Sequence, residues 1–472
     1  MKIAKTIKSD VLVVGGGGAG VYAAIEALRS GASVVLASKG KVGNSGNTIM
    51  IGGSYAMDGH SAKHRYGFEK GDDTVTKEVL LEQIIKQSFF LSEQDVAEQF
   101  VEDSPACVYE MYEWTERAGQ KQTFMSPGGW LISGHAMGVG LQQGLKENPG
   151  VQMVEDVMIT ELLTAEGRIA GAIGLDVYTG EVIRFDAKAV ILATGGYQPF
   201  SCKSTNSDMT GDGVAIAYRA GAKLADMEFL LPCMTALEPA VTRGSLMPFI
   251  YECMSGIAMS SVDKNGDPIV VPEEMRKVAE GSELEKLIST YYWSQAVEKG
   301  NGLEDDGMYY DFTGMSDEEI RASFQRYIDI MATFYRKGYY HGESIEMYRD
   351  YIIEHGKRIK VGAVFEYTMG GIVIDKDMAT NVPGLYAAGE AGSGVFGACR
   401  VADATTEMLV QGWKAGRTAA AYAKEAPAAI ADEAQVQAIL EELERPLTGD
   451  GQGMSGVDCI GAIHKAADLG FG

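Results

Sequence analysis

The residues best suited to chemistry near the start of the chain are a run of glycines that could hold a phosphate group. Residues 15–20 read GGGGAG, which satisfies the pattern G-x-G-x-x-G. In this pattern the first glycine permits a tight turn, the second lets the backbone approach a pyrophosphate, and the third allows a helix to pack closely on a strand. The phosphates lie at the N-terminus of the following helix, where backbone N–H groups favour negative charge. Gly15, Gly17, Gly18 and Gly20 are therefore predicted to bind a dinucleotide.

The residues after the next predicted strand favour FAD over NAD as that dinucleotide. An acidic side chain is usually found about 20 residues after the glycines, where it binds a ribose hydroxyl. Here Ser38 and Lys39 occupy that place. Because a serine hydroxyl can also bind ribose, the missing acid weakens the case for NAD more than the case for FAD.

Three later segments place small residues or a carboxylate where the backbone could meet a long ligand. They are TGG at residues 194–196, TGDG at residues 210–213 and GLYAAGE at residues 384–390. Each segment taken alone could be an ordinary turn. Because they are far apart in the sequence, together they favour an extended cofactor such as FAD.

The glycine run must be positioned by a strand and a helix, and the surrounding sequence predicts both. Val11–Val14 is a continuous apolar run, as in a strand buried on both faces of a parallel sheet. Tyr22, Ile25 and Leu28 follow at helical spacing, and residues 33–37 read as a second strand. This order predicts a strand–helix–strand unit with the glycines at its first turn.

Similar strand and glycine patterns return far along the chain, after a segment of different character. Residues 151–195 are rich in predicted strands, residues 235–355 are aromatic, acidic and largely helical, and residues 370–389 return to strands and glycines. The predicted fold is therefore α/β, with a Rossmann-like FAD-binding domain interrupted by an inserted α+β domain and a short C-terminal helical tail. The tail is expected to be a helix followed by a loop-rich end. The predicted boundaries are 1–234 and 356–428 for the FAD-binding domain, 235–355 for the inserted domain and 429–472 for the tail.

The composition excludes several classes of partner. Lys and Arg total 41 and Asp and Glu total 65 among 472 residues, so the net charge is −24. Such a charge disfavours nucleic acid and anionic membranes as partners. The apolar run near the N-terminus is too short for a signal peptide, and no segment approaches the length of about 18 apolar residues that membrane insertion requires.

The cysteines predict neither a metal site nor a disulfide framework. The chain has 6 cysteines with no CxxC or other metal-ligand spacing, so we predict no metal ligand and no iron–sulfur cluster in this chain. A reducing cytoplasm is the expected location. The charged runs at 274–286 and 303–306 are expected to be solvated faces.

The motifs together resemble the flavoprotein family of succinate dehydrogenase, fumarate reductase and L-aspartate oxidase, of which the chain is predicted to be a divergent member. The matching stretches are VVGGGGAGVYAAIEA, SGNTIMIGG, AVILATGGY, MTGDGVAIAYRAGAKLADMEF, YTMGGI and GLYAAGEAGSGVFGACR. The resemblance implies an FAD-binding domain and a mobile capping domain, with catalysis at their interface. The residues predicted to bind FAD, from the glycine-rich segments and from the resemblance, are Gly15, Gly17, Gly18, Gly20, Ser38, Lys39, Ser45, Thr48, Gly53, Thr194, Gly195, Asp212, Glu390, Thr405 and Thr406.

The chain departs from the family at the residue that links the flavin. In the respiratory members a histidine attaches FAD covalently, and counting back from the GG of SGNTIMIGG places that position at Gly46. Glycine has no nucleophile, so we predict that FAD is bound non-covalently. A flavin without the covalent link has in general a lower potential, which favours a reductase over a succinate oxidase.

The chain departs further at the positions that bind a dicarboxylate. Three family histidines fall at Cys233, Glu366 and Phe396, and a capping-domain arginine falls near Met254. Only Arg400 keeps its family type. A glutamate beside a substrate carboxylate costs several kcal/mol in a low-dielectric site unless it is protonated. Fumarate, succinate and aspartate are therefore not the expected substrates.

The predicted catalytic residues are those left at these positions. Arg400 is expected to anchor an anionic group of the substrate, and its alternative is a structural salt bridge. Glu366 and Tyr367 are candidates for the proton donor, with Glu366 alternatively an ion-paired acid. Cys233 is a candidate thiol, with burial as a small apolar residue its alternative, and the same alternatives hold for Cys253 and Cys399. Tyr251 and Glu252 are candidates from the capping side.

These residues predict an FAD-dependent oxidoreductase that reduces an activated C=C bond of a small organic acid or related metabolite. One alternative is a flavoprotein subunit of a larger electron-transfer complex, with an iron–sulfur or cytochrome protein as electron donor, as in adenylylsulfate reductase, a relative of the family. Another is a flavin-binding scaffold that has lost catalysis. In each case we predict a small-molecule ligand, no nucleic acid and no membrane insertion.

Overall fold

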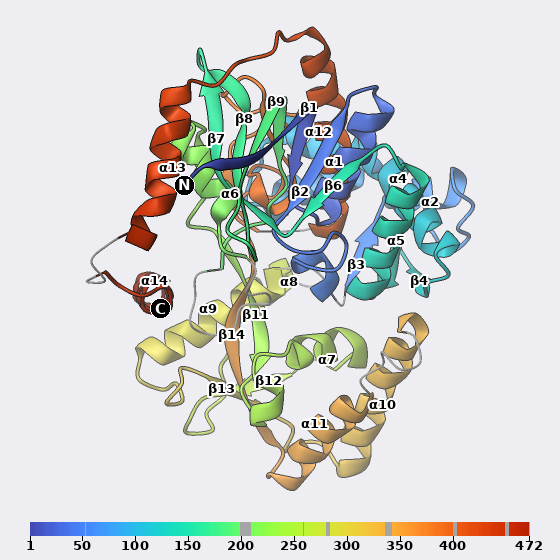
Figure 1. Cartoon of the computed structure of the whole chain (residues 1–472). Coiled ribbons are helices and arrows are strands. Elements are labelled where there is room, and N and C mark those ends of the chain that lie inside the picture. The colour runs from blue at the N-terminus through green and yellow to red at the C-terminus, as the bar shows by residue number, and fades with distance from the viewer. Residues whose placement is uncertain are drawn as a thin grey trace.

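The protein folds into two lobes that are joined by long strands (Figure 1). The computed structural model describes residues 1–51, 53–198, 209–257, 259–279, 284–335, 342–399, 404–448 and 453–471. Arg400, predicted from the sequence to anchor the substrate, lies outside the described residues. None of the described helices combines the length and the apolar character that a membrane span requires.

The first lobe is built on a seven-stranded sheet in the order β6-β2-β1-β9-β8-β7, with β16 also paired to β9. β1, β2, β6, β9 and β16 are parallel, whereas β7, β8 and β9 form an antiparallel ribbon. The bounds are Ile3–Val14 for β1, Val34–Ser38 for β2, Gln152–Glu155 for β6, Val157–Ala165 for β7, Arg168–Asp176 for β8, Val182–Leu192 for β9 and Leu385–Ala387 for β16. Val11–Val14 are buried as the apolar run predicts, because helices and loops cover both faces of the parallel part.

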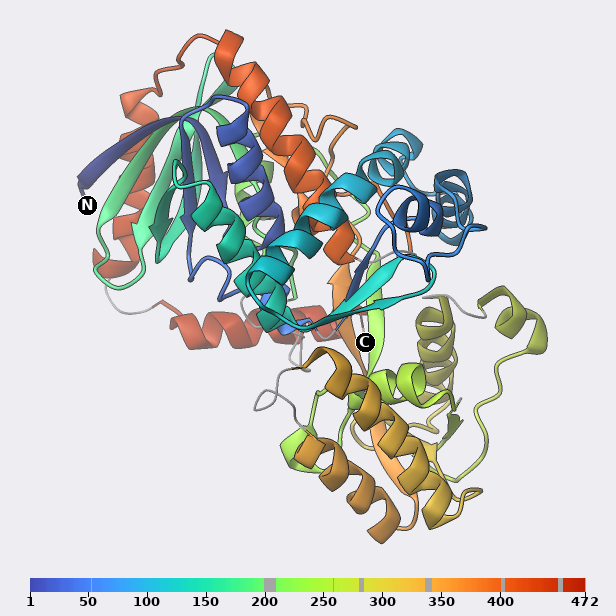
Figure 2. The same cartoon turned by 90° about the vertical axis from the view of Figure 1, so that its right-hand side faces the viewer.

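Two helices from opposite ends of the chain pack side by side on this sheet (Figure 2). They are α1, Gly18–Arg29, and α12, Ala404–Glu425. A Cβ at Gly412 would come within 2.3 Å of the Ala19 carbonyl oxygen, and one at Gly416 within 2.4 Å of the Ala23 carbonyl oxygen. The glycines of α12 therefore let the two helix backbones touch.

Smaller elements complete this lobe. A three-stranded sheet has the order β3-β5-β4. The bounds are Asn47–Met50 for η1, Ser54–Ala56 for β3, Gly59–His64 for α2, Lys77–Gln87 for α3, Gln94–Arg117 for α4, Gln122–Met125 for β4, Gly129–Ile132 for β5, Gly134–Glu147 for α5, Asp212–Arg219 for α6, Leu224–Ala225 for β10, Gly371–Ile372 for β15 and Gly389–Ala391 for η3.

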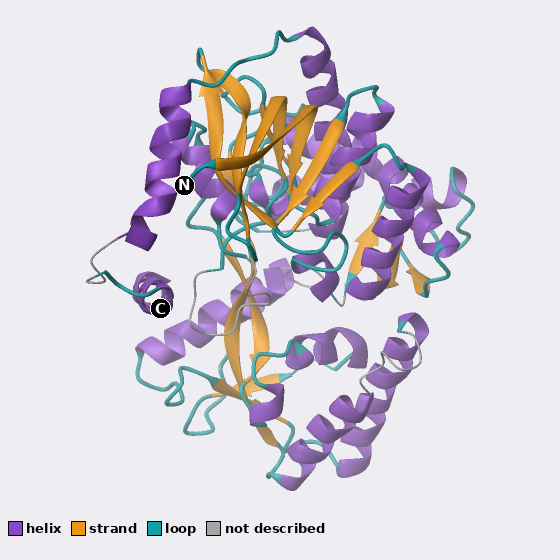
Figure 3. Cartoon of the chain, viewed as in Figure 1, coloured by secondary structure: helices purple, strands orange, loops and turns teal. Residues whose placement is uncertain are grey.

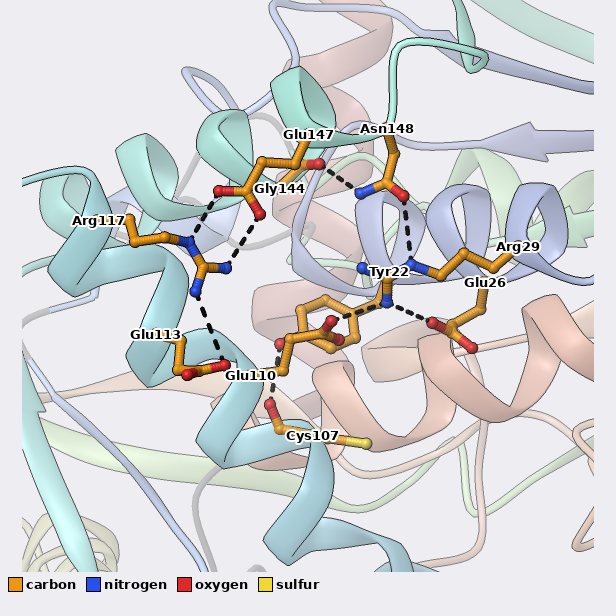
Figure 4. Close-up of polar contacts among 10 residues, drawn as sticks. All are labelled: Tyr22, Glu26, Arg29, Cys107, Glu110, Glu113, Arg117, Gly144, Glu147 and Asn148. Carbon is orange, nitrogen blue, oxygen red and sulfur yellow. Dashed lines mark hydrogen bonds and ion pairs between the residues drawn. The ribbon is translucent and has the colours of Figure 1, made fainter. Parts of the chain in front are cut away.

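A polar network fastens α1 to α4 and α5 (Figure 4). The Arg29 guanidinium is 2.8 Å from Glu26 and 2.7 Å from Glu110, and it also donates to the Asn148 side chain at 3.2 Å. Burial raises the pKa of Glu110 despite its hydrogen bonds with Arg29. Arg29 is therefore the cation that offsets the charge of the buried Glu26 and the partly buried Glu110.

The second lobe is α+β, with a four-stranded antiparallel sheet in the order β11-β14-β13-β12 (Figure 3). The bounds are Leu230–Ala236 for β11, Ala240–Thr242 for η2, Met247–Ser255 for α7, Ser260–Val262 for β12, Glu273–Ala279 for α8, Leu284–Glu298 for α9, Met308–Asp311 for β13, Asp317–Phe334 for α10, Gly342–Glu354 for α11 and Arg358–Thr368 for β14. Its core is a separate cluster that includes Tyr251, Phe324, Tyr348 and Ile352. We refer to this lobe as the cap.

Two strands connect the lobes, since β11 enters the cap and β14 leaves it (Figure 1). β11 runs across the predicted boundary at residues 234 and 235, and β14 begins just after the predicted boundary at residues 355 and 356. The domain boundaries themselves stay predictions.

The C-terminal tail contains two helices. α13, Glu433–Thr448, packs through Val436, Ile439 and Leu440 on the antiparallel ribbon of the first lobe. The expected loop-rich end is wrong, because residues Gly456–Phe471 form α14. The Ser455 hydroxyl accepts from Asp458 N at 3.1 Å and thereby caps the first turn of that helix.

Candidate active site

The glycine turn has the geometry that the sequence pattern predicts. Gly15 has φ +117°, and a Cβ at Gly20 would lie 1.8 Å from the Gly15 carbonyl oxygen, so the turn excludes larger residues at both positions. α1 begins after Gly17, and no side chain caps it there. Gly18 N donates to the Thr48 hydroxyl at 3.1 Å. Gly17 thus leaves the N-cap position of α1 without a side-chain acceptor, as a phosphate site requires.

The residues predicted around the ribose come together from distant segments. Ser38 is buried at the end of β2, and its hydroxyl accepts from Gly40 N at 3.4 Å. The Lys39 ammonium donates to the Thr210 hydroxyl at 2.6 Å and is 3.2 Å from an Asp212 carboxylate oxygen. Asp212 lies in the first turn of α6.

The segment after β9 contains a buried hydroxyl without a partner. Among the described residues, Thr194 Oγ1 is one of the buried polar atoms that make no hydrogen bond. A Cβ at Gly195 would lie 2.8 Å from the Met209 methyl carbon. The Glu390 carboxylate accepts from Thr368 N at 3.0 Å and from the Thr368 hydroxyl at 3.2 Å, which ties η3 to the end of β14.

The predicted residues at the start of α12 bind the β3 segment. The Thr405 hydroxyl donates to the Ser54 carbonyl oxygen, and the Thr406 hydroxyl accepts from Ala56 N at 2.8 Å. The Gly53 carbonyl oxygen accepts from Ile132 N at 3.0 Å. Ser45, by contrast, makes a local bond from its hydroxyl to the Lys41 carbonyl oxygen at 2.8 Å.

These observations fit an extended dinucleotide. The uncapped end of α1 suits a pyrophosphate, and the Thr194 hydroxyl is a buried group that a ligand can satisfy. The residues that would hold FAD therefore come from the βαβ unit, the segment after β9, η3 and the start of α12. Gly46, the position of the expected flavin-linking histidine, has φ +76°, and a Cβ there would meet no atom within 4 Å among the described residues.

Glu366 and Tyr367 lie next to each other on β14 but have different partners. Leu231 pairs with Tyr367 and Pro232 pairs with Phe365, so Glu366 is the extra residue of a β-bulge. Bulges re-aim side chains and are frequent beside active sites.

The Glu366 carboxylate forms an ion pair with Lys286 of α9. The distance from Lys286 Nζ to Glu366 Oε2 is 2.9 Å, and the Lys286 side chain is only 4% exposed, compared with 19% for Glu366. The same Nζ lies 3.9 Å from the centroid of the Phe249 ring. The Glu366 carbonyl oxygen accepts from the Gln198 side chain at 3.1 Å. Glu366 therefore joins the cap helix α9 to a residue that follows β9.

Lys286 was not identified as a site residue from the sequence, because residues 274–286 were expected to form a solvated face. This expectation is wrong for Lys286, because α9 is buried there as well as at Leu284 and Ile288. Leu284 and Ile288, one helical turn apart, were the available signal for a buried side of α9. They do not identify Lys286, because a residue midway between them lies on another side of the helix.

Tyr367 is part of a buried polar chain that runs into α12. Its hydroxyl donates to a Glu407 carboxylate oxygen, the other Glu407 oxygen accepts from the Gln411 side chain at 3.1 Å, and the Gln411 oxygen accepts from Gly389 N at 2.7 Å. Tyr367, Glu407 and Gln411 are all buried. The chain connects β14 to η3, and Glu407 and Gln411 were not identified from the sequence.

The candidates from the capping side differ in their surroundings. The Tyr251 hydroxyl donates to the Ser323 hydroxyl at 2.7 Å inside the cap core. Glu252 accepts from Met259 N at 3.0 Å and from the Tyr310 hydroxyl at 3.1 Å. Burial raises the pKa of Glu252 to about 7, although both hydrogen bonds act in the opposite direction. Glu252 is therefore a carboxyl that exchanges its proton near neutral pH.

The remaining candidate positions are mostly apolar. Cys233 lies on β11 opposite Val364 and is 0% exposed, and Cys399 is equally buried. Cys253 is exposed, so the alternative of a small buried residue is wrong there. Phe396 packs edge-on against Phe100 with the ring centroids 5.8 Å apart. Phe396 is therefore a core residue.

Comparisons with known proteins agree with this geometry. The family model described as FAD binding domain matches residues 10–405. An uncharacterized FAD-dependent oxidoreductase of Methanocaldococcus jannaschii is 29% identical over 94% of this chain and 78% of its own length. A fumarate reductase (CoM/CoB) polypeptide of Methanothermobacter marburgensis is 27% identical over 92% of this chain and 76% of its own length.

Solved structures show the same architecture. Mycobacterium smegmatis Sdh1 in complex with UQ1 has a TM-score of 0.77 and 25% identity, with 98% of this chain and 77% of that chain covered. Adenylylsulfate reductase from Archaeoglobus fulgidus has a TM-score of 0.71 and 16% identity, with 98% and 79% covered, and is thus similar in fold. The chain belongs to the FAD binding domain family, within the branch of the succinate dehydrogenase, fumarate reductase and L-aspartate oxidase flavoproteins.

Proposed function

We propose that this chain is an FAD-dependent oxidoreductase that reduces an activated C=C bond in a small organic acid or related metabolite. The observation that carries the proposal is the buried ion pair of Lys286 and Glu366 between the cap and the strand that leads to Thr368 and η3. FAD, when bound, supplies reversible hydride transfer. The reduction also needs a proton donor at the substrate.

We assign the transferable proton to Nζ of Lys286. An ammonium carries three donor protons, and Glu366, 2.9 Å away, holds it in one orientation. The low exposure of Lys286 keeps its ammonium away from bulk water. Tyr367 suits this role less well, because its hydroxyl already donates to Glu407 in the chain that leads to α12. We propose that Tyr367 instead supports the flavin-binding segments.

The same residues argue against a dicarboxylate substrate. Cys233 and Phe396, at two positions where the family resemblance predicts histidine, are buried and uncharged. At the third of these positions, the negative charge of Glu366 offsets the positive charge of Lys286. The positive charge at these positions is therefore too small to offset the cost of desolvating a second substrate carboxylate. We propose a substrate with one anionic group, bound by Arg400.

The test compares two Lys–Glu pairs, each of which has one residue on β14. Lys286→Met is expected to lower turnover about 100-fold or more, as loss of a general acid does. The matched control is Lys360→Met, which removes an ion pair of 2.9 Å with Glu238 at the far end of β14. Each protein is first reduced anaerobically, and its reoxidation by a panel of unsaturated acids is followed by flavin absorbance. Equal turnover in the two variants would reject the role of Lys286, and rapid turnover of fumarate would reject the proposed substrate class.

A second candidate function is suggested by the names of the relatives, several of which are flavoprotein subunits. In this function the chain passes electrons to or from a second protein, such as an iron–sulfur or cytochrome protein. The same reoxidation panel distinguishes the two functions. If no acceptor reoxidises the isolated chain but turnover begins when an iron–sulfur protein is added, the electron-transfer function is correct. If no acceptor works under either condition, the chain is a flavin-binding scaffold without catalysis.

A further inference from the structure

A cluster of two histidines and an aspartate lies on the surface of the first lobe, outside the proposed active site. The atoms that His60, His64 and Asp73 could offer to a metal ion all lie within 4.8 Å of one another, and all three residues are exposed. His60 and His64 are one turn apart on α2, so their rings share one side of the helix, with centroids 4.6 Å apart. The cysteine spacing, from which no metal site is predicted, carries no information about this pair.

The backbone fixes the third residue beside the two rings. His60 N donates to the Val75 carbonyl oxygen at 3.0 Å, and a Cβ at Gly59 would come within 2.4 Å of the Asp72 carbonyl oxygen. The Asp72 carboxylate accepts from Thr74 N at 2.9 Å and so closes the turn that presents Asp73. The loop of residues 72–75 is therefore held against the start of α2 by contacts that do not involve the three side chains.

The two oxygens of Asp73 have different partners. Oδ1 is 2.5 Å from His64 Nε2, whereas Oδ2 accepts from the Lys63 ammonium at 2.6 Å. A metal ion bound between the rings would therefore take Oδ1, and Lys63 would keep its bond to Oδ2. Metal-binding carboxylates are commonly oriented by such a second hydrogen bond.

We propose that His60, His64 and Asp73 bind a divalent transition metal ion, with Zn²⁺ as the preferred ion. Two imidazoles and one carboxylate form a donor set that zinc uses, and water would complete the tetrahedron. Zinc ligand bonds of about 2.0–2.2 Å require the His64 and Asp73 atoms to separate by a small rotation of side chains that are exposed. Glu78 interacts electrostatically with His60, and Glu69 and Asp72 do so with the neighbouring Lys63, so further acidic side chains near the cluster favour a cation.

The proposal is tested by zinc titration of the FAD-loaded full chain without an affinity tag. Cys253 and Cys459 are exposed thiols and are changed to Ser in every protein, so that thiolates do not bind the added zinc. Isothermal calorimetry with ZnCl₂ is expected to show one saturable site per chain. His60→Ala with His64→Ala is expected to weaken binding at least tenfold, and Asp73→Asn alone is expected to weaken it to a smaller extent.

The matched control is His355→Ala, which removes an exposed histidine that stacks on Tyr351 with centroids 3.9 Å apart. This variant is expected to bind zinc as the parent does. Flavin absorbance and the thermal midpoint confirm that each variant is folded. The proposal is wrong if the parent shows no saturable site, or if the double histidine variant and the His355 variant bind zinc equally.

Discussion

Among single residues, Gly20 of the glycine turn gives the clearest prediction about FAD binding. Gly20→Ala would place a Cβ 1.8 Å from the Gly15 carbonyl oxygen, a distance that backbone movement alone could relieve. We expect this variant to lose FAD or to fail to fold, because α1 can no longer pack against the turn. Gly314→Ala is the control, since a Cβ there meets no atom within 4 Å among the described residues. The flavin content of the two purified proteins is the measurement, and FAD retained equally in both would show that the turn tolerates a side chain.

Gly46 gives a prediction about how FAD is attached. The residue has no nucleophile where the family resemblance predicts the flavin-linking histidine. FAD should therefore be released into the supernatant when the protein is precipitated with acid. The absorbance of the supernatant and the pellet measures this, and flavin that stays in the pellet would contradict a non-covalent cofactor.

Some of these residues could be identified from the sequence and others could not. The glycines of residues 15–20 were identified because their function depends on local backbone geometry, which a short motif encodes. Lys286 was not identified, because a lysine in a charged run carries no local sign of burial. Its role depends on Glu366, whose orientation comes from a bulge that only the pairing of β11 with β14 creates.

At the scale of elements, the buried contact between Glu252 of α7 and Tyr310 of β13 should make cap stability depend on pH. Burial raises the pKa of Glu252 from 4.5 to about 7, so the folded cap holds this proton more tightly than the unfolded chain does. The associated stability is fully present below pH 4.5 and is lost as the pH rises to about 7, a total of about 3 kcal/mol. Glu252→Gln should remove this dependence, whereas Glu304→Gln, an exposed acid in the same lobe, should keep it. Urea unfolding between about pH 5 and pH 8.5 is the measurement, and parallel curves for wild type and Glu252→Gln would contradict it.

The polar network around Arg29 of α1, shown in Figure 4, predicts a loss of folding stability when Arg29 is removed. Arg29→Ala leaves Glu26 and Glu110 without their cation and should cost about 1–2 kcal/mol at pH 7, a value reduced because the Arg29 side chain is 38% exposed. The loss should shrink at acidic pH, since protonation of Glu110 removes the unpaired charge. The control is Arg445→Ala, which removes a comparable pair with Glu442 on an exposed surface. The measurement is the free energy of unfolding from urea titrations. An equal loss of stability in the Arg29 and Arg445 variants would contradict the prediction.

Elements were predictable where the periodicity is local. The unit of β1, α1 and β2 follows from an apolar run, a glycine turn and a helical repeat within about 30 residues, which is the usual length of such a unit. α14 was not predicted, because its sequence contains glycines that resemble a loop; Val457, Ile460 and Ile463 of this helix are exposed.

At the scale of the whole molecule, the cap has its own core and should be removable. Ala236 of β11 and Val361 of β14 are antiparallel partners, so residues 237–360 can be replaced by a short glycine-containing turn. We expect the shortened protein to bind FAD, because the residues predicted to hold FAD lie outside the replaced segment. It should not turn over substrate, because Lys286 is gone. Flavin content and the reoxidation assay measure the two properties, and a shortened protein that folds but lacks FAD would contradict the division into lobes.

The contact between α1 and α12 has a consequence for protein synthesis. Gly412 and Gly416 bring the backbone of α12 onto Ala19 and Ala23, although most of the chain separates these helices. During synthesis, the glycine turn of residues 15–20 therefore leaves the ribosome long before α12, the helix that packs beside α1, has been translated. The buried core of the cap lies within residues 234–361 apart from Leu131, so the cap can fold earlier. Cofactor capture is then a late event, and a translation arrest before residue 404 would leave a folded cap attached to an incomplete flavin domain.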